Sequence, residues 1–324
     1  MKQVPHPSDK WIQPRHWKTR DRIRSMISRW MVPASWDTIE SVVLFIGTPR
    51  AGASMFGALL DAHPHMCVAN EYNVLGCFID ATRQTPSRDD VLADMLWSSR
   101  CQSRKGRAGY NGAGGEYKYE VSGQFQGRYK APLKIVGAAK AGVTLLILNS
   151  HFNVLKRVQD TLSVPIKFVH VVRNPFDLFS TLHKSVKRRG ETRITTHIDR
   201  DFLKLLEDNS RALSWHKDCG CLVQQINGTL GGDSVLTVYQ EDIVREPELY
   251  LNQTADFLSL ARDDAWAADC ARIVWDNPHK SRDHIPWKAE AVEEVCKLIA
   301  ECGHLNDYYG GDSVGQSLPS HVIS

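Results

Sequence analysis

The chain has 324 residues, of which 42% are hydrophobic, and it carries 40 Lys and Arg against 37 Asp and Glu. This length and hydrophobic content suit one large globular domain with a complete core. A net charge of +3 gives no strong positive field, which argues against a nucleic-acid partner. No apolar run reaches the roughly 20 residues of a membrane helix, and the N-terminus lacks the apolar core of a signal peptide. We therefore expect a cytoplasmic protein whose eight cysteines are reduced.

Pattern and composition divide the chain into three parts. Residues 1–40 form a basic N-terminal extension, and residues 311–324 resemble a flexible tail. Between them, strand-like and helix-like segments alternate from residue 42 to about residue 245, and mainly helical sequence follows. This order predicts an α/β class, a three-layer fold with a central parallel sheet flanked by helices and a helical C-terminal cap, and the glycine-spaced loop described next makes this a P-loop-type fold.

The first strand-like run, residues 42–46, leads into a glycine-spaced loop and then an apolar helix. Against the Walker A pattern, Gly47 and Gly52 occupy the glycine positions and Ser54 the hydroxyl position, but Ala53 replaces the lysine. Arg50 supplies a cation three residues earlier. A nucleoside triphosphatase needs the missing lysine and a magnesium ion. The loop therefore predicts a phosphate-like ligand that needs no metal, and the alternative is an ordinary strand-to-helix turn.

A second basic site is expected where the strand-like run 166–172 ends at Arg173. The carboxyl end of a strand borders the ligand crevice in an open α/β sheet. Pro175 suits the first turn of the following helix, on which Asp177 and Thr181 share a face. An arginine and a hydroxyl at this place suit a second phosphate. The alternative is a helix start with a surface arginine.

Together the two segments resemble the sulfotransferase family, whose signatures are a Pro-Lys/Arg-Ser-Gly-Thr-Ser/Thr loop and an Arg-Asn-Pro…Ser segment. Residues 239–243 and 279–282 also resemble late segments of that family, so the likeness extends over about residues 41–310. Around the loop and Glu71 it is also similar to the protein-tyrosine branch. The matching segments read Pro49-Arg50-Ala51-Gly52-Ala53-Ser54 and Arg173-Asn174-Pro175 with Thr181 eight residues after the arginine.

The resemblance implies a sulfotransferase that moves a sulfuryl group from 3′-phosphoadenosine 5′-phosphosulfate (PAPS), without a metal. The acceptor would be a hydroxyl, or an amine, of a small molecule, carbohydrate or peptide. Ala51 and Ala53 depart from the pattern, since each lacks a hydroxyl that the family offers to the donor. The donor-binding residues that the resemblance implies are Arg50, Ala51, Gly52, Ala53, Ser54, Arg173, Thr181, Ser281 and Arg282.

Sulfuryl transfer needs a base for the acceptor proton and cations for the charge on the leaving oxygens. The resemblance implies Glu71 as the base, with Lys140 and Arg50 as the catalytic cations. Surface roles are the alternatives for Glu71 and Lys140. His63 and His151 are reserve candidates for the base, because another branch of the family uses a histidine.

Two other functions compete with this interpretation. A P-loop kinase would need magnesium and ATP. Ala53 and the lack of an acidic residue at the end of the strand-like run 166–172 oppose this function. A non-catalytic protein with a degenerate nucleotide site would explain Ala51 and Ala53.

Residues 106–130, rich in glycine and aromatic residues, would be either a hairpin over the active site or a plain surface hairpin.

Overall fold

A computed structural model of the chain describes residues 36–79, 85–107, 118–188, 196–210, 212–308 and 318–323. Its centre is a five-stranded sheet in the order β2-β3-β1-β4-β5, in which every neighbouring pair is parallel. The predicted α/β class with a central parallel sheet is confirmed. The strands are β1 (Ser41–Ile46), β2 (Met66–Ala69), β3 (Ile135–Ala138), β4 (Ile166–Val172) and β5 (Val235–Tyr239).

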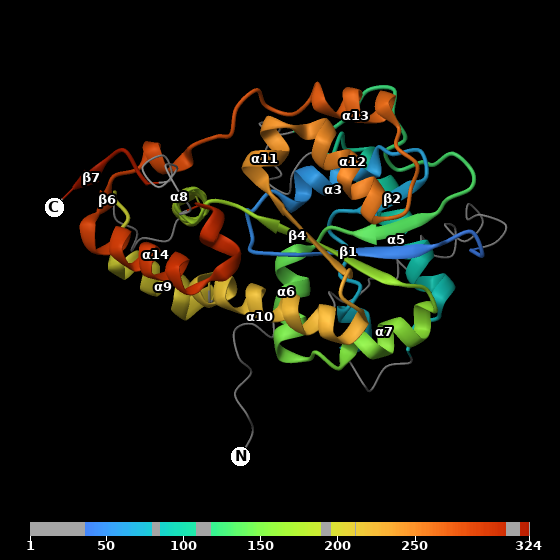
Figure 1. Cartoon of the computed structure of the whole chain (residues 1–324), viewed down its shortest axis with the longest axis horizontal. Helices are drawn as coiled ribbons and strands as arrows, with labels where there is room; N and C mark the ends of the chain where they lie inside the picture. Colours follow the sequence, from blue (N-terminus) through green and yellow to red (C-terminus); the bar gives the residue numbers. More distant parts are fainter. Residues whose placement is uncertain are drawn as a thin grey trace, which may run out of the picture.

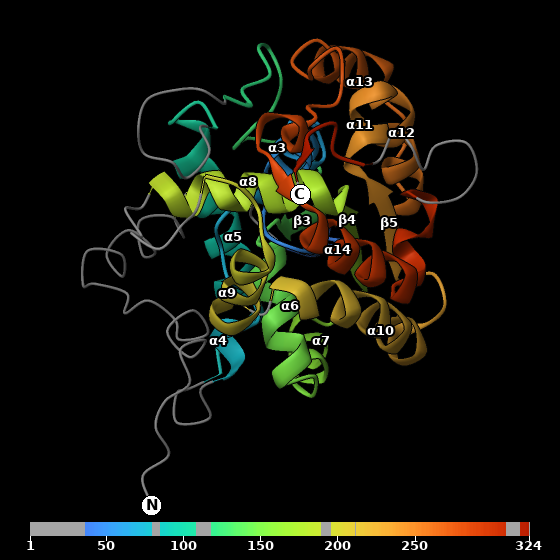
Figure 2. The same cartoon turned by 90° about the vertical axis from the view of Figure 1, so that its left-hand side faces the viewer.

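Helices cover both faces of the sheet, which gives the predicted three layers (Figure 1). One layer contains α3 (Ala53–Asp61), α11 (Gln240–Arg245), α12 (Pro247–Phe257) and α13 (Asp264–Ala271). The other contains α6 (Ala141–Ser150), α7 (Val154–Leu162) and α10 (Ala212–Leu230), and Figure 2 shows the same separation from the side. Two further helices are α4 (Gly76–Ile79) and α5 (Arg88–Ser103). Within the described part of the chain, no helix is long and apolar enough for a membrane span.

A third group of elements gathers beyond the carboxyl ends of the strands (Figure 1). The predicted C-terminal cap is helical, but it also holds two short strands that pair with each other. Val322 and Ile323 of the predicted tail form one of them, while residues 1–35 and 309–317 lie outside the described residues. The elements are α8 (Pro175–Arg188), α9 (Arg200–Ser210), η1 (Ser281–His284), β6 (Trp287–Lys288), α14 (Ala289–Glu301), η2 (Gly303–Tyr308) and β7 (Val322–Ile323).

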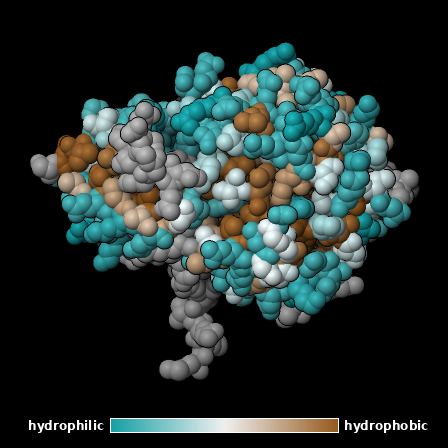
Figure 3. Space-filling view, viewed as in Figure 1, coloured by the Kyte–Doolittle hydropathy of each residue, from teal (hydrophilic) through white to brown (hydrophobic). Residues whose placement is uncertain are grey.

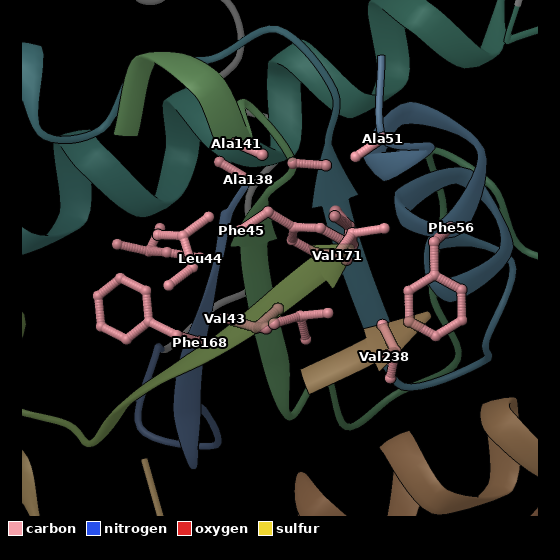
Figure 4. Packing of buried hydrophobic residues seen from close by; sticks show 14 of the residues in the cluster. Val43, Leu44, Phe45, Ala51, Phe56, Ala138, Ala141, Phe168, Val171 and Val238 are labelled. Carbon is pink, nitrogen blue, oxygen red and sulfur yellow. The ribbon is translucent and has the colours of Figure 1, made fainter. Parts of the chain in front are cut away.

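The core forms because most residues of the central strands β1 and β4 are apolar. All six residues of β1 are buried, as parallel strands covered on both faces require. Figure 4 shows Val43, Phe45 and Phe168 of adjacent strands in this cluster. Edge strand β5 is less covered, and Val238 alone of its five residues is buried. On that side, Figure 3 shows apolar residues at the surface between the two helix layers.

The outer edge of β2 is paired with side chains instead of another strand. Asp61 Oδ1 accepts a hydrogen bond from Val68 N at 2.6 Å, and Arg107 Nη2 donates to Val68 O at 2.9 Å. Gln102 Oε1 accepts from Asn70 N at 2.6 Å. Asp61 and Arg107 also form a buried ion pair. These side chains satisfy backbone groups that an edge strand would otherwise leave unpaired.

Residues 118–130 of the glycine- and aromatic-rich stretch lie at the far end of α3 from the P-loop. Phe125 N donates to Ala62 O at 3.2 Å, and Gln126 Nε2 donates to Ala58 O at 2.7 Å. The hairpin over the active site is therefore wrong for these residues, because their polar groups bind the C-terminal turn of α3. Residues 108–117 of the stretch lie outside the described residues.

We expect Arg107→Met to lower the free energy of unfolding by about 3 to 5 kcal/mol, because it leaves the buried Asp61 carboxylate without its counter-charge. The double variant with Asp61→Asn should lose less than the single variant, because it removes that unpaired charge. Urea unfolding measures both. Arg262→Met, which breaks the exposed pair with Asp256, is the control and should leave the midpoint unchanged within error. A loss below about 1 kcal/mol for Arg107→Met would contradict a structural role for the buried pair.

Candidate functional site

The predicted phosphate-binding loop joins the end of β1 to the start of α3. Gly47 has φ 142°, and a Cβ atom there would lie 2.6 Å from Val171 O. Gly52 has φ 106° and precedes the first residue of α3, and a Cβ atom there would lie 2.9 Å from Gln240 Cγ. Both glycines are thus required by backbone conformation and by the close approach of neighbouring segments. The glycine spacing reflects a tightly packed loop.

The N-terminus of α3 is suited to an anion. The first N–H groups of a helix have no partner within the helix, and its dipole favours negative charge there. The N-cap residue of α3, Gly52, has no side chain that could cap these groups. Ser54 is half-buried in the first turn, where its hydroxyl can face the same ligand.

The two alanines of the loop pack against the core. Ala51 is 1% exposed and belongs to the buried hydrophobic cluster (Figure 4). Ala53 is partly buried and packs against the same cluster. A hydroxyl at residue 51 would be buried away from water, which has a cost unless it finds a hydrogen-bond partner. The departure from the family pattern therefore has a packing explanation, and the backbone amides would carry anion binding in this loop.

Arg173 is the centre of the second predicted site. Its Nη1 donates to Thr181 Oγ1 at 3.3 Å and to Arg50 O at 3.2 Å. Its Nη2 donates to Ser281 Oγ and to His279 O, each at 3.3 Å. The structure thus brings together three of the predicted donor-binding residues, Arg173, Thr181 and Ser281, next to the P-loop.

Arg282, the fourth predicted residue of this site, has a different partner. Its guanidinium is buried and forms an ion pair with Asp177 of α8. Arg282 N also donates to Asp177 Oδ1 at 2.8 Å, and Arg282 Nε donates to Leu318 O at 3.3 Å. These bonds fix η1 against α8 and thereby place Ser281 beside Thr181, where their hydroxyls lie 3.3 Å apart. These contacts indicate that Arg282 holds the loop that carries Ser281 in place.

The surroundings of Arg173 carry positive charge. Burial, together with the neighbouring His284, Lys184 and Arg173, lowers the pKa of His279 below its ordinary value. Arg50 Nη2 donates to Ser185 Oγ at 3.1 Å, so a further guanidinium reaches α8. Cations at the end of a strand and near a helix N-terminus favour an anionic ligand.

Glu71 and Lys140 face each other at the same edge of the sheet. The adjacent parallel strands β2 and β3 are in register at Ala69 and Ala138, so the residues that follow them lie together. Lys140 Nζ is 2.9 Å from Glu71 Oε2 and donates to Glu71 O at 3.3 Å. Their side chains are 40% and 29% exposed for Glu71 and Lys140. A solvent-accessible carboxylate with an ammonium group beside it can accept a proton and stabilise a developing negative charge.

The two reserve histidines are far from this edge. His63 follows the C-terminal end of α3, packs edge-on against Trp266 at 4.7 Å between ring centroids, and has its pKa lowered to about 4 by burial. His151 follows the C-terminal end of α6 and is exposed. Each lies about ten helical residues, roughly 15 Å, from the site edge. A third histidine, His170 of β4, is buried with Nδ1 3.3 Å from Thr237 Oγ1.

Several residues of the site were missed by sequence reasoning. Ser185 lies four residues after Thr181, so the helical period could have placed both hydroxyls on one face. Gln240 packs on Gly52, and Glu241 Oε1 accepts from Asn174 N at 2.9 Å. These last two contacts join segments 67 or more residues apart, for which the sequence has no local signal.

No protein-family model and no curated protein sequence matches the chain. Solved structures that resemble it include the sulfotransferase domain of the Synechococcus PCC 7002 olefin synthase, at 16% identity and a TM-score of 0.42, covering 85% of this chain and 96% of that one. A sulfotransferase from Mycobacterium avium has 14% identity and a TM-score of 0.44, with 90% and 81% covered. Retinol dehydratase in complex with androsterone and inactive cofactor PAP has 13% identity and a TM-score of 0.33, with 85% and 78% covered.

We expect Gly52→Ala to weaken binding of adenosine 3′,5′-bisphosphate (PAP) by at least about tenfold while the fold persists, because a Cβ atom would strain the loop and displace Gln240. Calorimetric titration measures the affinity. Gly123→Ala is the matched control, since Gly123 also has positive φ, at 82°, but has open space around it and lies away from the loop. Equal PAP affinity in the parent and Gly52→Ala would exclude this loop from the binding site.

Proposed function

We propose that the protein is a PAPS-dependent sulfotransferase. The observation that carries the proposal is the convergence of two anion-binding places and a carboxylate–ammonium pair on one edge of the sheet. The N-terminus of α3 and Ser54 suit the 5′-phosphosulfate, and Arg173, Thr181 and Ser281 suit the 3′-phosphate. Glu71 and Lys140 suit the transfer itself.

The donor set of the second place fits a phosphate monoester. Arg173 Nε is buried and has no hydrogen-bond partner among the described residues. A buried donor without a partner costs free energy, and a ligand oxygen would satisfy it. The hydroxyls of Thr181 and Ser281 lie within hydrogen-bond distance of the same guanidinium. Charge-assisted bonds from arginine to phosphate are among the strong hydrogen bonds of proteins.

In sulfuryl transfer, Glu71 and Lys140 would each have one role. PAPS would supply the sulfuryl group and PAP as the leaving group. Glu71 accepts the proton of the acceptor hydroxyl as the acceptor oxygen bonds to sulfur, and the bond from sulfur to the phosphate oxygen breaks. Lys140 offsets the negative charge that moves onto the leaving phosphate. The acceptor leaves as a sulfate ester, and water takes the proton from Glu71.

The kinase alternative receives less support from the sheet. The two strands that flank β1 are followed by Ala139-Lys140 and Arg173-Asn174, in positions next to the loop where a kinase would place a magnesium-binding acid. The non-catalytic alternative is opposed by the Glu71–Lys140 pair, since a surface ion pair of this exposure contributes little to stability.

PAP should raise the melting temperature without magnesium, because the site offers amides, arginines and hydroxyls to both phosphates. At a PAP concentration 100 times the dissociation constant we expect about 2.7 kcal/mol of stabilisation, or a rise of roughly 5 °C. ATP with magnesium should shift the melting temperature less. Thermal-shift assays with each nucleotide, with and without magnesium, test this. Stabilisation by magnesium ATP and none by PAP would favour the kinase.

Glu71→Gln should lower the turnover number by roughly 10²- to 10⁴-fold and leave PAP affinity unchanged, because the amide cannot accept the acceptor proton. The assay follows labelled sulfate from PAPS to acceptors found in a screen of hydroxylated compounds. Glu40→Gln is the matched control, since Glu40 pairs with Lys134 at 2.8 Å just before β1, at the opposite end of the sheet. Turnover of Glu71→Gln within a few-fold of the parent would show that Glu71 is not the base.

A further inference from the structure

Two guanidinium groups meet on the same stretch of α8. Arg50 Nη2 donates to Ser185 Oγ at 3.1 Å, and Arg173 Nη1 donates to Thr181 Oγ1 at 3.3 Å. Ser185 lies one turn after Thr181, and its hydroxyl donates to Thr181 O at 2.9 Å. Side chains four residues apart on a helix have Cβ atoms about 5 to 6 Å apart. That spacing lets one tetrahedral anion bind both arginines.

The backbone of Arg50 strengthens this link. Arg50 has φ 75°, in the left-handed region that glycine adopts freely and other residues rarely do. Its carbonyl accepts a hydrogen bond from Arg173 Nη1 at 3.2 Å. The two arginines are therefore joined through the loop backbone as well as through α8. Strained conformations of this kind concentrate at functional sites, and here the strained residue contacts Arg173 through its carbonyl and Ser185 of α8 through its guanidinium.

The place between the two arginines is cationic. The positive charges of Lys184 and Arg173 both lower the pKa of His279. The carbonyl of His279 accepts a hydrogen bond from Arg173 Nη2 at 3.3 Å. Asp177, which raises the pKa of His279, has its own charge offset by an ion pair with Arg282. Two arginines beside three hydroxyl groups suit a dianion with several oxygens, as in a phosphate monoester.

We propose that Arg50 binds the same phosphate as Arg173, so that the ribose 3′-phosphate of the donor is held between two guanidinium groups. Arg50 then determines specificity for nucleotides that carry a 3′-phosphate, although it lies in the loop that binds the 5′ end. The 5′ end is left to the amides of α3, Ser54 and Lys140. This inference rests on the proposed function and changes the expected position of Arg50 within it.

The test compares PAP with AMP, which differ by the 3′-phosphate alone. Calorimetry gives both dissociation constants for the parent, Arg50→Ala and Arg50→Gly. Both variants remove the guanidinium, but glycine accepts the positive φ and alanine does not, so agreement between them separates the side chain from backbone strain. We expect PAP affinity to fall by about 10- to 100-fold in both, and AMP affinity by less than about threefold. Ser185→Ala should act in the same direction and more weakly.

Each other outcome overturns a stated part of the account. An equal loss of PAP and AMP affinity would place Arg50 on the 5′ anion, and unchanged affinity for both would remove it from the nucleotide site. Either result would overturn the inference and leave the proposed function intact. A parent protein that binds PAP no better than AMP would contradict the 3′-phosphate site itself, and the proposed function with it.

Discussion

One guanidinium group, that of Arg173, joins three segments that are far apart in the sequence. It donates to the P-loop carbonyl of Arg50, to Thr181 on α8, and to His279 and Ser281 before and at the start of η1. The parallel sheet makes this possible, because β1 and β4 are neighbours and both end at the same edge. The relative position of the two candidate anion-binding places depends on these bonds, since they connect the loops that form both.

Two buried ion pairs hold the segments that carry the candidate site residues. Asp61 and Arg107 hold the outer edge of β2, and Gln102, which accepts from Arg107 and from Asn70 N, extends this support to the residue before Glu71. Asp177 and Arg282 hold η1 to α8 and so place Ser281. Buried pairs are poor sources of net stability compared with apolar packing, but they fix geometry well when fully hydrogen-bonded. The more exposed Glu71–Lys140 pair is different, because solvent leaves it free to exchange partners.

The sequence allowed the fold class and part of the site to be predicted. Apolar runs marked β1 and β4, and the glycine spacing marked the loop, because these are local patterns. Arg173 and Thr181 were found together, since eight residues separate them along one strand end and one helix. The short strands β6 and β7 have two residues each, too few for a periodic pattern.

Contacts across long separations could not be predicted in the same way. Asp177 and Arg282 are 105 residues apart, and only the fold shows that this arginine has an internal partner. Arg50 and Ser185 are separated by 135 residues. Glu71 and Lys140 were suggested by resemblance, and their pairing over 69 residues appears only with the register of β2 and β3. Burial likewise argues against His63, which was a reserve base because another branch of the resembling family uses a histidine.

The most direct test of the account is a crystal structure of the protein with PAP. We predict that the 3′-phosphate lies within hydrogen-bond distance of Arg173 and Thr181, and that the 5′-phosphate lies against the first-turn amides of α3. Glu71 and Lys140 should then flank the 5′-phosphate, on the side where an acceptor would approach. A nucleotide bound in the reverse direction, or away from the carboxyl edge of the sheet, would contradict the two-phosphate site and the sulfuryl transfer built on it.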